Sequence, residues 1–257
     1  MQQYHLGLVS VSFRPHTPEE ILKAMKHTAL QYIEWGSDVH APCNDLSRLE
    51  NIAKLQAEYG ITCCSYGTYF RLGTTPITEL PQYIRAAKIL GTSILRLWCG
   101  NKSGKDMSVN ERTDLLAECR KAAKIARHND VILCMECHRN TFTENPEDAV
   151  WLMKAVNSPY FRMYWQPFQW QNIQQNIENA RKIAPYTEHI HVFNWQDTQK
   201  LPLAGAVTDW QSYLQCFAKS HMLLLEFMPQ GTLEELHDEA ESLSQIAGGM
   251  YENNLSL

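Results

Sequence analysis

The sequence predicts an α/β protein that folds as a single (β/α)8 TIM barrel over residues 1–257. Eight short apolar runs, typical of buried parallel strands, alternate with segments of helical periodicity roughly every 32 residues. No proline-rich or glycine-rich linker divides these units. Strict alternation requires parallel strands joined by right-handed crossovers, and eight such units suffice for a closed barrel. We favour the barrel over an open doubly wound sheet, which is the alternative.

The strands and helices follow from local signals taken in order. Strand-like runs begin near Tyr4, Gln31, Ile61, Ser93, Val131, Phe161, His189 and Met222. A capping box at Thr17 and Glu20 marks the first helix, and Ser108 with Glu111 marks the fourth. Gly60 is a natural end for the second helix. The other helices are expected to begin near Asp45, Ile77, Asn145, Gln171, Asp209 and Gly231.

The composition excludes several classes of protein. A hydrophobic fraction of 44% with 20% charged residues is typical of a soluble globular protein. A net charge of −5 argues against a nucleic-acid partner. No apolar stretch approaches the ~20 residues that span a bilayer, and the N-terminus lacks the features of a signal peptide. We therefore expect a cytoplasmic protein with no membrane partner, and the sequence leaves a homo-oligomer open.

Eight cysteines are expected to be reduced, buried residues rather than disulfides. Cys134 and Cys137 are spaced like a metal-binding pair. On a strand, however, residues three apart face opposite sides, so these two thiols would not bind one ion.

Strands five to eight each end on a side chain that can bind a cation, and this recurrence is the main functional signal. These residues are Glu136, Gln166, His191 and Glu226. Catalytic residues of such barrels lie at the carboxyl ends of the strands. Taken singly, each has a structural explanation, such as an ion pair between Glu136 and Arg96 or Arg139. Together, the mixed oxygen and nitrogen donors favour a site for Mn²⁺, Mg²⁺, Co²⁺ or Zn²⁺.

These residues also carry a family resemblance across essentially the whole chain. Glu136-Cys-His138, His191-Val and Leu225-Glu226-Phe are similar to motifs of the sugar-phosphate isomerase/epimerase family, with its xylose-isomerase-like TIM barrel. That family includes ketose 3-epimerases, hydroxypyruvate isomerase and the inosose enzymes. The resemblance implies one bound divalent metal ion, with Glu136 and Glu226 as ligands and as the acid/base pair. It also implies that His191 is a ligand and that His138 lies on the substrate side.

The chain departs from the family at the end of strand six. The family usually has an aspartate there with a histidine three residues later, whereas this chain has Gln166 and Gln169. A glutamine still offers a carbonyl oxygen to a cation, but the ligand set loses one negative charge, so metal affinity should fall. The segment 193–197 also lacks the basic residue that some epimerases have after the strand-seven histidine.

Tryptophans near the strand ends indicate the substrate class. Trp35, Trp98, Trp165, Trp170 and Trp195 lie at or just past the ends of strands two, four, six and seven. Their indoles either stack on a sugar or cyclitol, which we favour for the group, or cover the barrel core beneath long loops. The predicted substrate-binding residues are His138, Glu34, Arg96, Trp98, Trp165, Gln169 and Trp195. Lys102 and Lys105 are better interpreted as a solvated loop than as a phosphate site, because no glycine-rich cradle accompanies them.

The leading hypothesis is a divalent-metal-dependent isomerase or epimerase acting on a sugar, keto-sugar or cyclitol. One of Glu136 and Glu226 would remove the proton beside the carbonyl, and the other would return it. A second hypothesis is a metal-assisted lyase or dehydratase for a keto-cyclitol or glycoside, with His138 as the acid. A third is a carbohydrate-binding barrel without turnover. A phosphodiesterase resembling the AP endonucleases is disfavoured, because the chain shows neither a histidine-rich multi-zinc cluster nor a basic surface.

Overall fold

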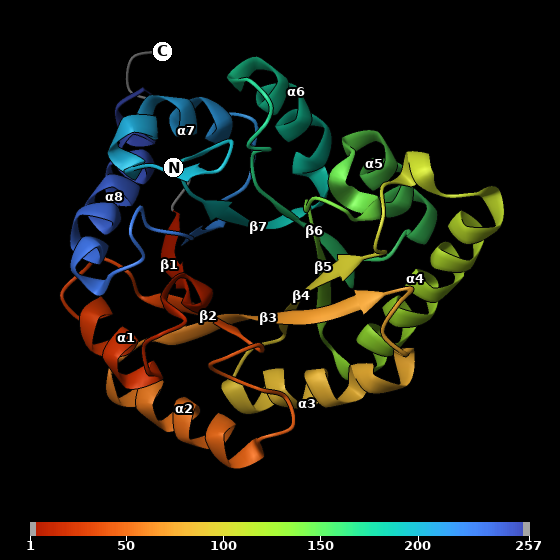
Figure 1. Cartoon of the computed structure of the whole chain (residues 1–257), viewed down its shortest axis with the longest axis horizontal. Coiled ribbons are helices and arrows are strands. Elements are labelled where there is room, and N and C mark those ends of the chain that lie inside the picture. Colours follow the sequence, from red (N-terminus) through yellow and green to blue (C-terminus); the bar gives the residue numbers. More distant parts are fainter. Residues whose placement is uncertain (1–3, 254–257) are drawn as a thin grey trace.

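Eight parallel strands close into a barrel that is surrounded by helices (Figure 1). The computed structural model describes residues 4–253. Residues 1–3 and 254–257 lie outside the described residues, and residues 1–3 belong to the N-terminal stretch from which we expected no signal peptide. The barrel strands are β1 His5–Val9, β2 Tyr32–Gly36, β3 Thr62–Leu72, β4 Ile94–Cys99, β5 Ile132–Glu136, β6 Phe161–Trp165, β7 Thr187–Val192 and β10 Met222–Leu225. Their order around the barrel is β1-β10-β7-β6-β5-β4-β3-β2, and β10 pairs with β1 to close it. The predicted (β/α)8 barrel is confirmed.

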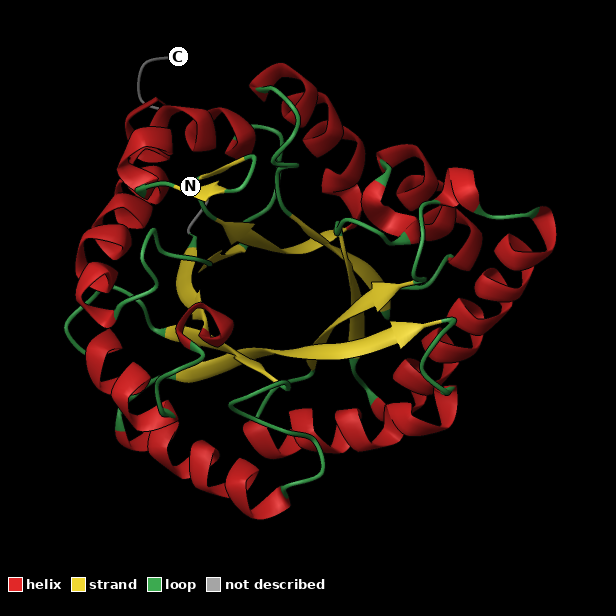
Figure 2. Ribbon diagram, in the orientation of Figure 1, coloured by secondary structure: helices red, strands yellow, loops and turns green. Residues whose placement is uncertain are grey.

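The helices form the outer ring (Figure 2). They are α1 Pro18–Met25, α2 Leu46–Glu58, α3 Leu80–Leu90, α4 Val109–Asn129, α5 Pro146–Val156, α6 Ile173–Ile183, α7 Val207–Leu214 and α8 Leu236–Asn253. Short 3₁₀ turns lie at Ser10–Phe13, Ile77–Glu79, Gly104–Asp106, Phe142–Glu144, Ala184–Tyr186, Leu203–Ala206 and Leu233–Glu235. Within the described residues, no helix is long and apolar enough to cross a membrane.

Local sequence signals account for most of the helix boundaries. The capping boxes at Thr17 and Ser108 are formed, and each caps the third residue of its helix. Gly91 adopts φ 85°, a left-handed conformation that costs glycine little, and it ends α3. The helices expected at Ile77 and Gly231 begin later than predicted, because a 3₁₀ turn precedes α3 and another precedes α8.

Alternation along the strands divides the core into two layers. One large cluster lies between the strands and the helices, and a small cluster fills the barrel interior. The buried members of the inner cluster are Val9, Val11, Cys64, Cys134, Tyr164 and Leu224. Cys137 belongs to the outer cluster, so it faces away from Cys134 as expected, and all eight cysteines are free. The inner cluster is the apolar floor on which the polar residues of the strand ends lie.

Candidate active site

Charged side chains fill the barrel above its apolar floor. Arg96 comes from the middle of β4 and Glu136 from the last residue of β5. His191 lies on β7, and Gln166 and Glu226 immediately follow β6 and β10. All five are at most 8% exposed. They converge because inward positions alternate along each strand and because the carboxyl ends of parallel strands lie at one end of the barrel.

A buried arginine links two of the carboxylates. Arg96 donates from Nε to Glu34 Oε1 at 2.9 Å and from a terminal nitrogen to Glu136 Oε2 at 2.6 Å. The hydroxyl of Ser65 donates to the other oxygen of Glu34 at 2.8 Å. Gly67 leaves room for this pair, because a Cβ there would lie 2.6 Å from Glu34 Oε1. Burial is the largest effect on Glu34 and would raise its pKa, but Arg96 and His191 together outweigh it and lower that pKa to about 2.

His191 lies at the centre of the remaining polar groups. Its Nδ1 is 3.1 Å from Gln166 Oε1, 3.5 Å from Glu226 Oε2 and 3.7 Å from Glu136 Oε1. Burial alone would lower the pKa of His191, but the neighbouring carboxylates, Glu226 foremost, raise it to about 10. The protonated ring donates its Nδ1 hydrogen to the glutamine oxygen. An ion bound at Nδ1 would displace this hydrogen.

The two predicted catalytic carboxylates have different surroundings. Glu136 Oε2 accepts hydrogen bonds from both Arg96 and Trp98 Nε1, each at 2.6 Å. Burial opposes ionisation of Glu136, yet the guanidinium holds the pKa of this carboxyl well below its usual range. For Glu226, burial is the largest effect, and it raises the pKa to about 7 despite the proximity of His191. Environments that separate two carboxyl pKa values in this way are typical of acid/base sites.

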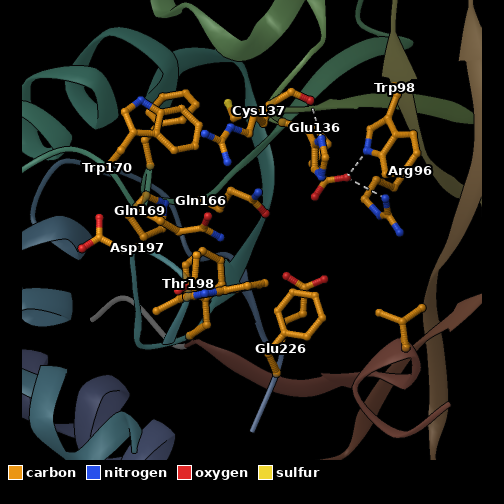
Figure 3. Close-up of a pocket in the computed structure, with 18 of the residues that line it drawn as sticks. Arg96, Trp98, Glu136, Cys137, Gln166, Gln169, Trp170, Asp197, Thr198 and Glu226 are labelled. Carbon is orange, nitrogen blue, oxygen red and sulfur yellow. Dashed lines mark hydrogen bonds and ion pairs between the residues drawn. The ribbon is translucent and has the colours of Figure 1, made fainter. Parts of the chain in front are cut away.

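A pocket of about 400 Å³ opens above these groups. Figure 3 shows Glu136 and Glu226 directed into it from different sides. His138 lines the pocket with its ring 4.7 Å from that of Trp98. Its Nδ1 lies 2.8 Å from the carbonyl oxygen of Arg139. A carbonyl oxygen can only accept, so Nδ1 carries the hydrogen and Nε2 is left for a substrate.

Comparison with known proteins identifies the family. Residues 22–242 match the family described as xylose isomerase-like TIM barrel. The chain belongs to this family. The match covers most of the sequence and confirms the resemblance that the motifs at Glu136, His191 and Glu226 indicated.

One curated protein and one crystal structure from Bacillus anthracis carry a dehydratase name. A curated 3-dehydroshikimate dehydratase is 21% identical over 119 residues, which are 46% of this chain and 42% of that relative. The chain therefore matches under half of the length of that protein. The crystal structure of the probable 3-DHS dehydratase AsbF, involved in petrobactin synthesis, superimposes with a TM-score of 0.78 at 17% identity, covering 94% of this chain and 98% of that one.

Other members of the fold have different descriptions. The IOLI protein, solved with a bound zinc atom, gives a TM-score of 0.76 at 14% identity, covering 97% of this chain and 99% of that one. D-psicose 3-epimerase from Clostridium cellulolyticum H10, solved with D-tagatose, gives 0.63 at 11% identity, covering 98% and 97%. Likenesses at such low identity establish the fold alone.

The donor set of the family site suits a divalent ion. Nδ1 of His191 lies 3.1–3.7 Å from one oxygen of each of Glu136, Gln166 and Glu226, which is about the separation of neighbouring ligands around one ion. The two carboxylates are nevertheless far apart. In a compact metal site, three or more His, Cys, Asp or Glu ligand atoms lie within 4.8 Å of one another. Among the described residues, only the exposed cluster of His237, Asp238 and Glu241 meets this distance criterion. The donor atoms at the barrel mouth are thus of the right type for a divalent ion, but they are spaced more widely than the ligands of a compact metal site.

Two predicted substrate residues lie elsewhere. Trp165 is 1% exposed and packs outside the barrel against Trp210, Tyr213 and Phe217. It is adjacent to Tyr164, which faces inward, so alternation directs its indole toward the helices. Glu34 is fully buried beside Arg96 and does not line the pocket. Neither Trp165 nor Glu34 is therefore placed to contact a substrate in the pocket.

The other predicted substrate residues line the pocket: Arg96, Trp98, His138, Gln169 and Trp195. Several lining residues lack any strong sequence signal. Tyr69 lies within β3, and the others lie on loops after β1, β5, β7 and β10. These loop residues include Arg14, Arg139, Asp197, Thr198 and Phe227. Asp197 and Thr198 form the tip of a small antiparallel ribbon of β8 Trp195–Gln196 and β9 Gln199–Lys200. Asp197 adopts φ 50° there without the glycine that would have marked such a turn.

Proposed function

We propose that this protein is a lyase that eliminates water, or another leaving group, from a polyhydroxylated keto compound. Both the isomerase and the lyase hypotheses begin with removal of the proton beside a carbonyl. They differ in the next step: an epimerase of this family uses two carboxylates in turn on the same carbon, whereas an elimination needs one base and one acid. The unequal surroundings of Glu136 and Glu226 support elimination.

The observation that carries the proposal is the set of hydrogen bonds at Glu136. Two donors at 2.6 Å, Arg96 and Trp98, share one oxygen of Glu136. Donors to a carboxylate stabilise its charged form and so make it a weak base. Among the described residues, no hydrogen bond reaches the carboxylate of Glu226, whose nearest ionic partner is His191 at 3.5 Å. The site therefore offers one available base, Glu226, at the edge of the pocket.

The mechanism follows from the positions of Glu226 and His138. Glu226 takes the proton from the carbon beside the carbonyl, and the C–H electron pair passes into an enolate. That electron pair then forms the C=C bond as the C–O bond to the leaving hydroxyl breaks. The acid is the imidazolium form of His138, which carries a hydrogen on both ring nitrogens. Its Nε2–H gives its proton to the departing oxygen, so water leaves, and Nδ1 keeps its hydrogen on the Arg139 carbonyl. The result is an unsaturated ketone and one water, with a proton gained by Glu226 and one lost by His138.

A divalent ion held by Glu136, Gln166, His191 and Glu226 would supply Lewis-acid polarisation of the carbonyl. The role of Arg96 is separate, because it holds Glu136 ionised and in place. The contact of the His138 ring with Trp98 and its hydrogen bond to the Arg139 carbonyl fix the direction of the imidazole.

The comparisons support this choice over the leading hypothesis of the sequence. The curated protein from Bacillus anthracis is named 3-dehydroshikimate dehydratase, and the crystal structure from the same organism is described as a probable 3-DHS dehydratase. An epimerase remains the second candidate, because Glu136 and Glu226 both line the same pocket and D-psicose 3-epimerase shares the fold.

Product analysis in D₂O distinguishes the candidates. The purified protein is incubated with Mn²⁺, Mg²⁺ or Zn²⁺ and a panel of 3-dehydroshikimate, inososes, ketohexoses and keto-disaccharides. The products are examined by mass spectrometry. We expect at least one product that is lighter than its substrate by one water. A product of unchanged composition that carries solvent deuterium would instead establish the epimerase. If no compound reacts or exchanges under any metal, the proposed lyase is wrong for this substrate class.

A further inference from the structure

A second cavity adjoins the catalytic pocket. It has a volume of about 360 Å³ and lies between the loop 167–172 after β6, the loop 193–198 after β7, and α7. Gln169, Trp170, Trp195 and Asp197 line both cavities and form part of their common boundary. Figure 3 shows Gln169, Trp170 and Asp197 grouped on the side of the pocket away from Arg96. A ligand larger than one ring would therefore extend toward the second cavity.

The lining of this second cavity is uncharged or acidic. The catalytic pocket contains three arginines, Arg14, Arg96 and Arg139, whereas no lysine, arginine or histidine lines the second cavity. Besides the hydroxyl of Tyr213, its polar side chains are mainly amides and carboxylates: Gln169, Gln171, Asn176, Asn194, Gln196, Asp197 and Asp209. Such groups hydrogen-bond hydroxyls in both directions and disfavour an anion. The chemistry fits a neutral ligand that is rich in hydroxyls.

Aromatic side chains at the boundary match such a ligand. Trp170 is 46% exposed, and the Arg139 guanidinium lies 5.1 Å from the centre of its ring. An exposed indole beside a cavity offers a flat apolar surface on which a sugar ring can stack. Trp195 has an indole nitrogen that is buried and makes no hydrogen bond to any described residue. A buried polar group without a partner is costly.

The walls of the cavity are held in place without a ligand. Asn176, at 3% exposed, accepts from the backbone nitrogen of Phe168 at 2.8 Å. Its amide nitrogen donates to the carbonyls of Phe168 and Gln171 at 3.1 and 3.3 Å. Trp210 donates to the carbonyl of Phe193 at 2.8 Å, which ties the other loop to α7. A cavity formed in advance binds its ligand with a small ordering cost.

We propose that this second cavity is a subsite for a neutral sugar ring, so that the substrate is a two-ring glycoside whose reacting ring occupies the catalytic pocket. The proposal rests on the proposed function for the identity of the reacting ring. The stacking surface of Trp170 and the amide groups around it recognise the second ring.

Binding of neutral disaccharides tests the subsite without any turnover. Affinities of the full-length protein for cellobiose, lactose, maltose, trehalose and glucose are measured by ligand-observed NMR. We expect at least one disaccharide to bind about tenfold more tightly than glucose, since one stacked ring with its hydrogen bonds contributes at least that factor. If no disaccharide binds more tightly than glucose, the subsite is refuted.

Variants confined to the second cavity locate the effect. Ile173 begins α6, is 38% exposed and lines the second cavity but not the catalytic pocket. Ile173→Trp narrows the cavity, and Asp209→Ala removes a hydroxyl acceptor. Each should reduce the disaccharide advantage at least threefold while glucose affinity stays unchanged. The matched control is Val109→Trp, which places the same indole at the exposed first residue of α4, remote from both cavities.

An advantage that persists undiminished in both cavity variants would refute the subsite. The test is independent of the lyase assay. Disaccharide binding with the expected variant pattern supports the subsite even if no elimination is found. If the protein eliminates water from a single-ring compound but binds no disaccharide more tightly than glucose, the subsite proposal fails and the lyase proposal stands.

Discussion

Replacing Arg96 by methionine tests the buried ion pairs that Arg96 forms with Glu34 and Glu136. Methionine keeps much of the side-chain volume but leaves Glu34 and Glu136, at 0% and 3% exposed, without their common cation. Removing one partner of a buried ion pair costs about 3–5 kcal/mol. The free energy of unfolding of a typical domain is about 5–15 kcal/mol, so we expect a folded but clearly destabilised variant.

The loss should depend on pH in a defined direction. In the wild type, the lowered pKa of Glu34, about 2, gives stability that is present above the unfolded pKa and is lost only as pH falls toward 2. In Arg96→Met, burial raises the pKa of both carboxyls instead, so protonation relieves the penalty in mildly acidic solution. The difference in unfolding free energy should therefore be larger at pH 7 than at pH 4.5.

Urea unfolding of chelator-treated protein at the two pH values measures this difference. Lys102→Met is the control, because Lys102 pairs with Glu111 at the surface, where an ion pair contributes little. A loss below about 1 kcal/mol at pH 7, or an equal loss at both pH values, would refute the account of Arg96 as the cation that keeps Glu34 and Glu136 ionised.

Three further substitutions probe the metal ligands, the acid and the packing. Gln166→Asp adds a negative charge to the ligand set, so Mn²⁺ or Zn²⁺ should bind about tenfold to a hundredfold more tightly by calorimetry on chelator-stripped protein; unchanged or weaker binding would remove Gln166 from the ligands. His138→Gln should slow elimination by more than ~10²-fold while exchange of the substrate C–H with solvent persists, since only the acid is lost; equal loss of both would contradict its role as the acid. Gly67→Ala places a Cβ 2.6 Å from Glu34 Oε1 and 2.8 Å from an Arg96 nitrogen, so it should lower the thermal midpoint by several degrees; an unchanged midpoint would show that the pair can shift freely.

The barrel and the convergence of strand-end residues could be predicted because both depend on periodic signals. A buried parallel strand has an apolar run of recognisable length, and its end is marked by the first polar residue. Glu136, Gln166, His191 and Glu226 could be placed together for that reason, since one end of a barrel gathers all its strand ends.

Proximity to a strand end does not decide which face a side chain occupies. Trp165 immediately precedes Gln166, yet it faces the helices because its neighbour Tyr164 faces the barrel interior. The register shift between β6 and β7 near Tyr164 also has no signature in the sequence. The loop residues of the pocket, such as Arg14 and Asp197, were beyond prediction, because their positions depend on tertiary contacts, such as the pairing of Arg14 with Asp38 at 2.7 Å.

The central claim is that Glu226 is the base that removes the proton from carbon, and the exchange rate of that proton measures it most directly. The substrate is the compound that the wild type dehydrates. Wild type and Glu226→Gln are compared on it in D₂O at saturating Mn²⁺, and the Mn²⁺ affinity of each protein is measured in parallel. We predict that Glu226→Gln loses both elimination and C–H exchange by more than ~10²-fold, because an amide cannot accept the proton. Exchange at the wild-type rate in a metal-loaded Glu226→Gln variant would contradict the claim.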